Sequence, residues 1–558
     1  MYKSCYPLIK FSLGIGLAEE KIVLEFKNIA LIALIVILVA FSILELQVTF
    51  SSPISFGDEA YHTAMAHYMA KNIDYPQWNA IEGTDVGRDN FGRPPMLHLI
   101  ESGFFLIFGF NEGIVKFLIP FITLLTSLVI FILTKRLFNE IAAFIAAVVY
   151  FTIPSVVTYS VTFFVETLVT FYFALTVLLF IYSVKTGRKK HLYLAGAFFA
   201  FAFLTEVSSV VLIMFFMLAI LYEISKGHLD TKRYATLAVL FLIFTGGFFI
   251  RNFAFYGNPG CHIPFTDKFF DKTGCTLGVT TRDQVFQYQS ITGGGGSNDS
   301  VYAMGILNYL NFAYGTVWVV TLGVLGGLVV SLGRRDIANI LLILVLVTII
   351  PYFHFTTSRA EDAARNLLAW TPLLSILVGL YFSKIFDFLK SYTKYIAPVI
   401  LVIIIFMGYS YNLLPKLQTM IQVKQFYPLF FEACDWVKGN LPEAAVISTV
   451  WVHRAAYSCE RTTVGNLPDI FLSKNITLVD KTAKDVGITH LFIQKFSLSN
   501  SDISETYRVD VVQFFEDHPE YFDKIYENGP IWGTQEMQQC LQSGNCDSGS
   551  MVYELKLL

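Results

Sequence analysis

Charged residues are scarce in this chain of 558 residues. Asp, Glu, Lys and Arg make up only 15% of it, whereas 54% of the residues are hydrophobic and 16% are aromatic. The net charge of -3 leaves no basic stripe of the kind that binds nucleic acid, and the chain has no acidic tail. A long chain of this composition is predicted to be a membrane protein rather than a large soluble one.

A cleaved signal peptide is not expected at the N-terminus. Residues 1–27 carry seven charged side chains before the first apolar run begins. A signal peptide would place its apolar core much closer to the start. Residues 28–50 are therefore expected to act as an uncleaved anchor.

Apolar segments long enough to cross a bilayer follow one another from residue 28 to residue 414. The fifth is short, so 191–224 is either a tight hairpin or a partly re-entrant pair. The hydropathy pattern predicts an α-helical polytopic membrane protein with about eleven transmembrane helices. They lie near residues 28–50, 113–134, 141–161, 165–184, 191–205, 207–224, 234–252, 313–333, 337–357, 366–384 and 395–414.

Lysine and arginine predict the orientation of these spans, because both gather in short cytoplasmic loops. They fall in alternate gaps, on the side of the lysine-bearing N-terminus. With an odd number of spans, the loops 51–112 and 253–312 and the tail lie outside. The predicted parts are a cytoplasmic segment 1–27, a transmembrane domain 28–414 and an extracytoplasmic domain 415–558, in the plasma membrane.

Cysteine usage agrees with this orientation. Six of the seven cysteines, all but Cys5, fall in segments predicted to lie outside, where disulfides form readily. Free buried thiols are the alternative. The simplest pairs are Cys261 with Cys275, Cys434 with Cys459, and Cys540 with Cys546.

The tail returns to ordinary charge density and is predicted to be a small α/β domain. We expect helices over 430–438 and around 509–526, and strands over 445–450, 490–494 and 551–557. No metal cluster or nucleophile motif stands out in it. A lid, a docking surface or an acceptor-positioning module is the expected role.

The loop from Phe56 to Arg93 is the one long polar segment in the front half of the chain. It opens with Asp58 and Glu59 and closes with Arg93. Ionisable residues at the edge of a membrane span are costly and usually functional. Further ones recur at the outer ends of later spans, at Glu166, Glu206, Arg251 and Arg365. Together they indicate an external cavity that holds an anion and a base.

Ordinary structural roles are open for each of these residues. Asp58 could cap a helix over residues 59–71. Arg93 and Arg365 could be interfacial anchors that reach lipid headgroups. Glu166 and Glu206 could cap spans or pair with an arginine. Their convergence at one membrane depth favours a site.

Four short motifs recur at the edges of the predicted spans: Gly57-Asp58-Glu59, Arg93-Pro94-Pro95-Met96, Arg251-Asn252 with Tyr256-Gly257-Asn258-Pro259, and Arg365-Asn366-Leu367-Leu368. They resemble those of the GT-C superfamily, the membrane glycosyltransferases that use polyprenyl-phosphate-linked sugars. The closer branch looks like the protein O-mannosyltransferase and aminoarabinose-transferase group. Two departures are Glu166, where the family often has Asp, and Glu206, near which it often has Lys. The Trp-Trp-Asp-Tyr-Gly signature of oligosaccharyltransferases is absent from the tail.

The resemblance implies an inverting glycosyltransferase that moves a sugar from a polyprenyl (dolichyl) phosphate to an acceptor hydroxyl. Asp58 would be the general base, and Glu59 a second acid that positions Asp58 or the sugar. The donor phosphate would be held by arginines. These are Arg93, Arg251 and Arg365, while His62, Glu166, Glu206, Tyr256 and Asn258 would support the substrate site.

The implied partners are the lipid-linked sugar donor, a glycan, lipid or protein acceptor, and membrane lipid, with no nucleic acid. A divalent metal stays open as a cofactor, because some relatives use one and others do not. A transporter or flippase for a lipid-linked or anionic substrate is the main rival. An assembly protein is a third, but it leaves Asp58, Glu59 and Arg93 unexplained.

The orientation can be tested by cysteine accessibility. Single cysteines at Lys135 and Arg334 should be protected from an impermeant external reagent, and cysteines beyond Lys416 should be labelled. The opposite labelling pattern would place the candidate site in the cytoplasm.

Overall fold

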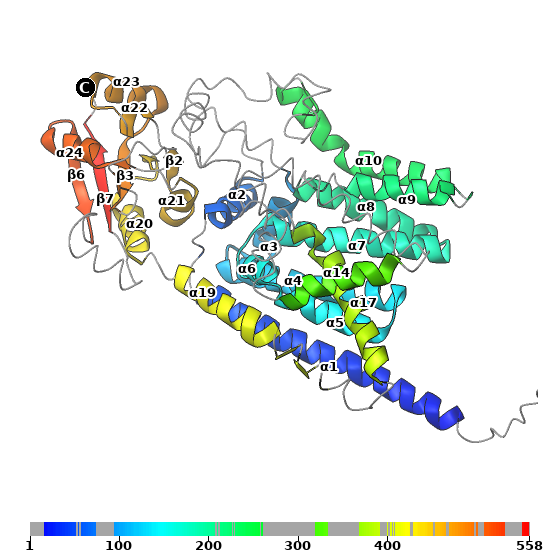
Figure 1. The fold of residues 1–558 in the computed structure, drawn as a ribbon. Helices are drawn as coiled ribbons and strands as arrows, with labels where there is room; N and C mark the ends of the chain where they lie inside the picture. The colour runs from blue at the N-terminus through cyan, green and yellow to red at the C-terminus, as the bar shows by residue number, and fades with distance from the viewer. Residues whose placement is uncertain are drawn as a thin grey trace, which may run out of the picture.

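The computed structural model combines a helical bundle with a small C-terminal domain, called the external domain below because it lies outside the bundle (Figure 1). At some positions within these helices and strands it describes the backbone alone. The residues that the structure describes are 16–51, 54, 57–73, 94–206, 209, 212–225, 227, 229–256, 258–260, 318–332, 368–390, 399, 402–403, 405–406, 408–424, 428–449, 452–464, 468–471, 473–495, 498–499, 507–529 and 549–556.

Five helices in the described part of the chain are long and apolar enough to cross a membrane. The predicted spans that fall on described residues coincide with helices, whereas 337–357 lies outside the described residues, so the count of eleven stays a prediction. Helix α1 already begins within the charged N-terminal segment. The five are α1 (Gly16–Phe50), α4 (Glu112–Leu137), α7 (Val165–Thr186), α10 (Thr231–Tyr256) and α17 (Thr371–Lys390).

The predicted span 141–161 is broken into α5 (Glu140–Thr152) and α6 (Pro154–Ser160), which are bent by 62°. Pro154 opens α6, and Ile153 before it is extended at φ -65° and ψ 127°. A residue before proline avoids the helical region, so the proline breaks the span there. The break turns the chain toward α7 and places residues 160–163 at the end of the bundle that faces the external domain, called its outer end below (Figure 1).

Shorter helices complete the bundle: α8 (Lys189–Thr205), α9 (Leu212–Ser225) and α14 (Trp318–Leu332). Helix α7 packs on α4 and α8, and α17 packs on α5 and α14. Asn139 caps α5 by accepting from the Ala142 amide at 2.8 Å. Its own side-chain amide donates to Ser383 on α17 at 2.8 Å, so one residue starts a helix and fixes its neighbour.

Two helices lie between the bundle and the external domain (Figure 1). The first coincides with the helix expected over residues 59–71, and the second was not predicted as a separate element. They are α2 (Gly57–Asn72) and α3 (Met96–Phe108), which pack against each other. The expected loop 51–112 therefore contains two helices. Helix α3 has 13 residues, so it is about 20 Å long, too short to span a bilayer.

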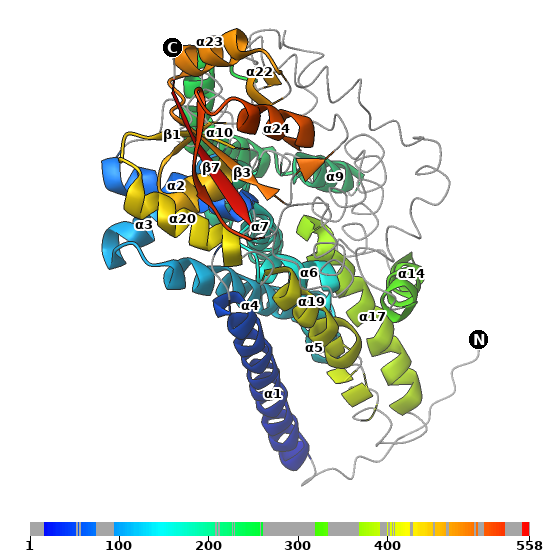
Figure 2. The same ribbon diagram turned by 90° about the vertical axis from the view of Figure 1, so that its left-hand side faces the viewer.

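The external domain has a five-stranded sheet in the order β2-β1-β3-β7-β6. Its strands β1, β3 and β7 are labelled in Figure 2. Strands β1 (Val446–Ser448), β2 (Thr462–Val464) and β3 (His490–Gln494) are parallel neighbours. Strand β7 (Ser550–Leu555) pairs antiparallel with β3 and with β6 (Phe522–Glu527). The helices around the sheet are α20 (Pro428–Asn440), α21 (Val452–Cys459), α22 (Pro468–Phe471), α23 (Ile476–Val486) and α24 (Val509–Asp517).

The α/β character predicted for the tail is confirmed, with one error. The helix expected around 509–526 ends at Asp517, and 522–527 forms β6 instead. Phe522 and Ile525 are residue types that favour a strand. The backbone of this segment pairs with β7, and local propensity alone does not predict that pairing. The disulfide Cys434–Cys459 is confirmed, while the other two proposed pairs lie outside the described residues.

Helix α17 approaches α5 closely at Gly379. A Cβ built on Gly379 would lie 2.3 Å from the Ala142 carbonyl oxygen, which belongs to backbone and cannot move aside cheaply. Small residues at helix contacts are typical of membrane proteins, because they let backbones come together.

Gly379→Ala is expected to lower the thermal unfolding temperature of the detergent-solubilised chain, since relieving such a clash costs about 1–3 kcal/mol. Gly246→Ala on α10 is the matched control, because its added Cβ meets nothing within 4 Å. It should be neutral or mildly stabilising, as alanine favours helix over glycine. If the two variants melted together, the close α5–α17 contact would be refuted.

Candidate active site

Helix α2 carries the acidic pair directly after α1. The helix begins at Gly57, two residues before the predicted start, so Asp58 lies in its first turn. The side chain of Asp58 lies outside the described residues. An acid in the first turn is stabilised by the helix dipole, so a purely structural benefit of Asp58 remains compatible with this position.

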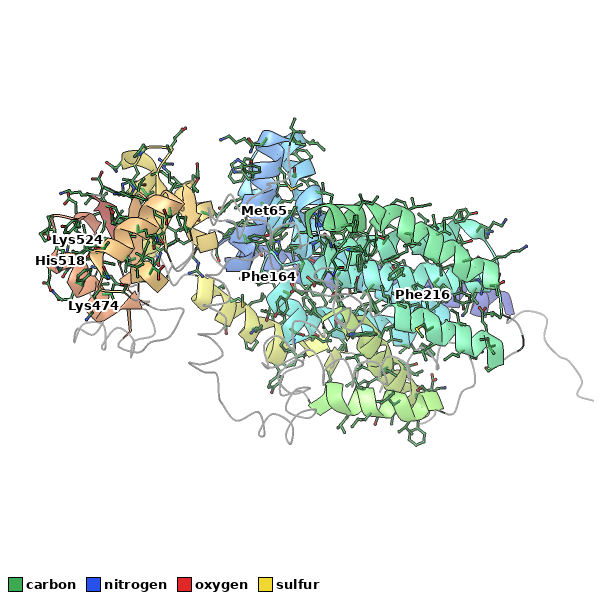
Figure 3. The ribbon with its side chains drawn as sticks, turned by 90° about the horizontal axis from the view of Figure 1, so that it is seen from above. Met65, Phe164, Phe216, Lys474, His518 and Lys524 are labelled. Carbon is green, nitrogen blue, oxygen red and sulfur yellow. A yellow bond between two sulfur atoms is a disulfide. The ribbon has the colours of Figure 1, made fainter. Side chains whose placement is uncertain are left out.

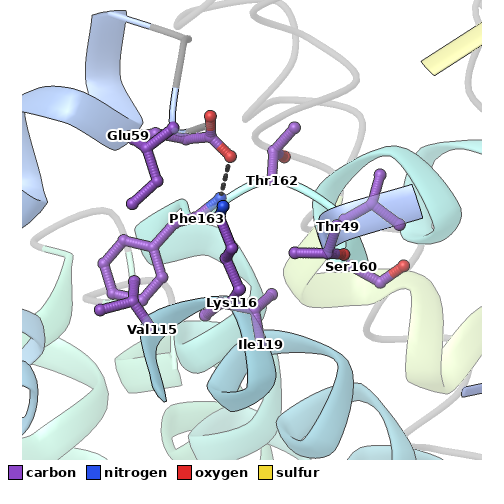
Figure 4. A pocket seen from close by; sticks show the side chains of 10 residues that line it. Thr49, Glu59, Val115, Lys116, Ile119, Ser160, Thr162 and Phe163 are labelled. Atoms are coloured by element: carbon purple, nitrogen blue, oxygen red, sulfur yellow. Dashed lines mark hydrogen bonds between the residues drawn. The ribbon is translucent and has the colours of Figure 1, made fainter. Parts of the chain in front are cut away.

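Glu59 is buried, with 2% of its surface exposed. Its Oε1 accepts a hydrogen bond from the Phe163 backbone amide at 2.7 Å (Figure 4). Phe163 lies between α6 and α7, so this bond joins the start of α2 to the outer end of the bundle. A buried carboxylate held by a backbone amide fixes the rotation and depth of the helix that carries it.

Glu59 lines a small pocket at this junction. Its walls come from α1, α2, α4 and the segment after α6, and its polar lining comprises Thr49, Lys116, Ser160 and Thr162 beside Glu59 (Figure 4). The side chain of Lys116 is only 11% exposed and forms an ion pair with Glu112, with 2.7 Å between Nζ and Oε2. The pocket therefore contains a carboxylate and an ammonium group in a poorly hydrated place.

The polar lining continues into the membrane domain. Ser160 donates from Oγ to Glu45 Oε1 on α1 at 2.5 Å, and Thr49 donates from Oγ1 to the Glu45 carbonyl oxygen at 2.8 Å. Glu45 is fully buried. An acid buried in a membrane helix is unusual and normally has a polar partner, which Ser160 supplies here.

A second buried polar cluster joins α2 to α3. His62 Nδ1 and His98 Nε2 are 2.8 Å apart, with 2% and 1% of the two residues exposed. One ring nitrogen donates and the other accepts, so at least one of the two imidazoles is neutral. Tyr61 contacts both rings edge-on, at 5.2 Å and 5.9 Å between centroids.

Glu101 lies one turn after His98 on α3 and is completely buried. Burial raises the pKa of Glu101 well above its ordinary value, and the hydroxyl of Thr63 offsets only part of the rise. Burial therefore favours the protonated form of this carboxyl group. Helix α3 thus contributes a histidine and a buried acid to the side of α2 that it packs against.

The external domain reaches this junction through α21, which packs on α2. Met65 of α2 lies between the external domain and the bundle (Figure 3). Tyr457 of α21 donates from its hydroxyl to Glu112 Oε1 at the head of α4. The C-terminal domain therefore covers the candidate site where α21 contacts α2 and α4.

The other predicted site residues are placed only in part. Glu166 is in the first turn of α7, as expected, and Glu206 follows the last residue of α8. Arg251 lies within α10, which continues past the predicted end of that span to Tyr256, and its guanidinium stacks on Phe248 at 4.9 Å. The side chains of Arg93, Arg365 and Tyr256 lie outside the described residues.

Asn258 has a local structural role. It is 8% exposed, and its Oδ1 accepts from the Gly260 amide at 2.8 Å, an Asx turn that follows α10. The structure therefore brings Glu59 and His62 into one junction, while a meeting of the arginines with that junction stays a prediction. Across the described ranges, no group of three or more His, Cys, Asp and Glu residues has the geometry of a metal site.

Several residues of the junction were not predicted: Glu45, His98, Glu101, Glu112, Lys116 and Tyr457. Helix α3 could have been found, because apolar residues recur at helical spacing from Met96 to Phe108 while His98 and Glu101 share one face. Lys116 follows Glu112 by four residues at the head of a predicted span, which is the spacing of a helical ion pair.

Comparisons with known proteins bear on this arrangement. Residues 92–248 match the family model for dolichyl-phosphate-mannose-protein mannosyltransferase. No curated protein sequence matches the chain. The matched segment runs from the end of the polar loop, through α3, to α10.

Three solved structures share the fold. The oligosaccharyltransferase of Archaeoglobus fulgidus, tethered with an acceptor peptide, is 12% identical with a TM-score of 0.64, over 94% of this chain and 88% of that one. ArnT from Cupriavidus metallidurans, bound to undecaprenyl phosphate, is 12% identical with a TM-score of 0.52, over 82% and 92%. The arabinofuranosyltransferase AftD from Mycobacteria is 12% identical with a TM-score of 0.51, over 93% and 40%.

These likenesses establish the fold, which is that of the GT-C membrane proteins. The family match over residues 92–248 agrees with the expected resemblance to the mannosyltransferase and aminoarabinose-transferase branch, and the fold is shared with ArnT. Fold and function are separate inferences, so the substrates have to be argued from the site.

Glu101→Gln tests the buried acid. The folded pKa of Glu101 lies above the ordinary value of 4.5, so the native chain holds a proton that the unfolded chain releases above that pH. The free energy of unfolding of the parent should therefore fall as the pH rises from about 4.5 toward the folded pKa, by at most about 1.4 kcal/mol per pH unit. Glutamine carries no such proton.

Thermal unfolding at several pH values measures the difference. Glu101→Gln should melt above the parent at pH 8, and this advantage should shrink toward pH 4.5. Glu520→Gln, at an exposed position of the external domain, is the control and should show no such trend. An advantage that does not change with pH would mean that Glu101 is ionised in the folded chain.

Proposed function

We propose that the chain transfers one sugar from a polyprenyl phosphate to an acceptor hydroxyl, with inversion, at the outer face of the plasma membrane. The observation that carries this proposal is the anchoring of Glu59 to the Phe163 amide. Glu59 follows Asp58 directly, so a fixed Glu59 also fixes the first turn of α2, to which Asp58 belongs. A general base must be held in one geometry to act.

Two acids in sequence then have two roles. Glu59 is committed to the Phe163 amide and acts as the positioning residue. Asp58 is left to receive the proton.

In the proposed reaction, the acceptor oxygen attacks the anomeric carbon from the face opposite the phosphate, while Asp58 takes the hydroxyl proton. The bond between the anomeric carbon and the phosphate oxygen breaks, and a polyprenyl phosphate monoester leaves. One displacement inverts the anomeric centre. Arginine can donate two hydrogen bonds to the departing phosphate, and Arg93, Arg251 and Arg365 are the proposed donors.

Related folds support a lipid-phosphate donor. ArnT has been observed with undecaprenyl phosphate, and the archaeal oligosaccharyltransferase with a dolichol-phosphate. The five apolar helices found in the described residues suit a lipid donor that stays in the bilayer. A peptide or glycan acceptor is proposed because the archaeal enzyme holds an acceptor peptide.

A divalent metal is kept as an option in the proposal. The archaeal enzyme also has a structure in complex with Zn and sulfate. Loss of transfer after treatment with a chelator, and its return on adding the metal, would decide whether this chain needs one.

Asp58→Asn separates catalysis from helix stabilisation. An amide cannot take and hold the proton, and loss of a positioned base typically lowers a rate by about 100- to 10,000-fold. Lost interaction with the helix dipole costs only about 0.3–1 kcal/mol of stability. We expect transfer to be lost while expression, thermal stability and donor binding stay near those of the parent.

Glu59→Gln is the neighbouring control. Its amide oxygen can still accept from Phe163, so the variant should fold and keep more activity than Asp58→Asn. If Asp58→Asn kept its turnover and Glu59→Gln lost it, the base would be Glu59. Full activity in both variants would refute catalysis by this acidic pair.

A further inference from the structure

We propose that Tyr457, on the external domain, is a positioning residue for the transfer reaction. Its hydroxyl holds Glu112, and through Glu112 it sets the place of Lys116 in the Glu59 pocket. This inference rests on the proposed function. It gives the C-terminal domain a role inside the site of the membrane domain.

The contact between the two domains is built around α21. Ala456 packs against Tyr61 and Met65, which come after the acidic pair in α2. The Tyr457 ring lies 6.4 Å from that of Phe110, between centroids. Tyr457 is the side chain that extends from this apolar contact to the head of α4.

Glu112 uses both of its carboxylate oxygens. Oε1 accepts from the Tyr457 hydroxyl, and Oε2 lies 2.7 Å from Lys116 Nζ. Lys116 lines the pocket together with Glu59. A chain of directed contacts therefore runs from the external domain, through one carboxylate, to an ammonium group in the pocket. Such networks are stronger where water is excluded, as at the 11% exposed Lys116.

The polar contact goes beyond what docking requires. Apolar packing of Ala456 on α2 would hold the domains together without placing a part-buried hydroxyl on the Glu112 carboxylate. Burial raises the pKa of Tyr457 far above its usual range, and the negative charge of Glu112 raises it further. Tyr457 therefore stays protonated and remains a donor to Glu112 at any working pH.

The position of Tyr457 is fixed from within its own domain. Cys459, two residues later, ends α21 and forms a disulfide with Cys434 on α20. Both cysteines belong to the same hydrophobic core. Tyr457 is thus presented to Glu112 by a short helix that the disulfide ties to the domain.

A double-mutant cycle on the full-length chain tests the proposal. Tyr457→Phe, Glu112→Gln and the double variant are compared with the parent for kcat and donor KM, after reconstitution in lipid. Tyr457→Phe keeps the ring and loses only the hydroxyl. We expect its kcat to fall roughly 10-fold, the scale of a hydrogen bond to a charged group, with donor KM changed less than about twofold.

The double variant should be no slower than Glu112→Gln alone, because Tyr457 acts through Glu112. Tyr521→Phe is the matched control, since Tyr521 packs against the other core of the same domain, and it should match the parent. If the fold-losses in kcat of the two single variants multiplied in the double variant, Tyr457 would not act through Glu112. If Tyr457→Phe keeps the kcat of the parent, the proposal is overturned altogether. If Tyr457→Phe misfolds, Glu112→Gln replaces it as the test, and an unchanged kcat in Glu112→Gln overturns the proposal.

The parent and Asp58→Asn are run in the same assay. If the parent transfers sugar, Asp58→Asn does not, and Tyr457→Phe equals the parent, only the role of Tyr457 falls. If the parent transfers no sugar from any polyprenyl phosphate, the proposed function falls and this inference falls with it.

Discussion

The hydrogen bond from the Phe163 amide to Glu59 joins the two parts of the molecule that form the candidate site. One partner is set by the broken span: Pro154 bends the chain and brings residues 160–163 to the outer end of the bundle. The other partner is set by α2, which begins within a few residues of α1. Breaking this bond would leave a buried amide and a buried carboxylate to be satisfied, so the start of α2 has little freedom.

Around this bond, the junction is made from elements that meet only in the folded chain. Helix α3 supports α2 from below through the His62–His98 pair, and α21 covers it from the external domain. The ion pair of Lys116 and Glu112 lies between these layers. The proposed function requires that Asp58 be held in one geometry, and these contacts hold α2 from several sides.

Features that depend on a local pattern of residues could be predicted from the sequence. Apolar runs marked the spans, and the acidic pair, the cysteine pair 434–459 and most elements of the external domain followed from residue type and spacing. What it could not provide is the pairing of distant groups: Tyr457 and Glu112 are 345 residues apart, and His62 and His98 are 36 apart. No periodicity links such positions. The strand over 522–527 was mistaken for helix because its partner β7 comes later in the chain.

The most direct measurement is transfer by the purified, lipid-reconstituted chain supplied with a panel of polyprenyl-phosphate sugars, with the anomeric configuration of the product read by NMR. The account predicts that one of these donors is consumed, that a polyprenyl phosphate monoester is released, and that the product has the opposite configuration at the anomeric carbon. A product with retained configuration, or transfer only from a soluble nucleotide sugar, would contradict it.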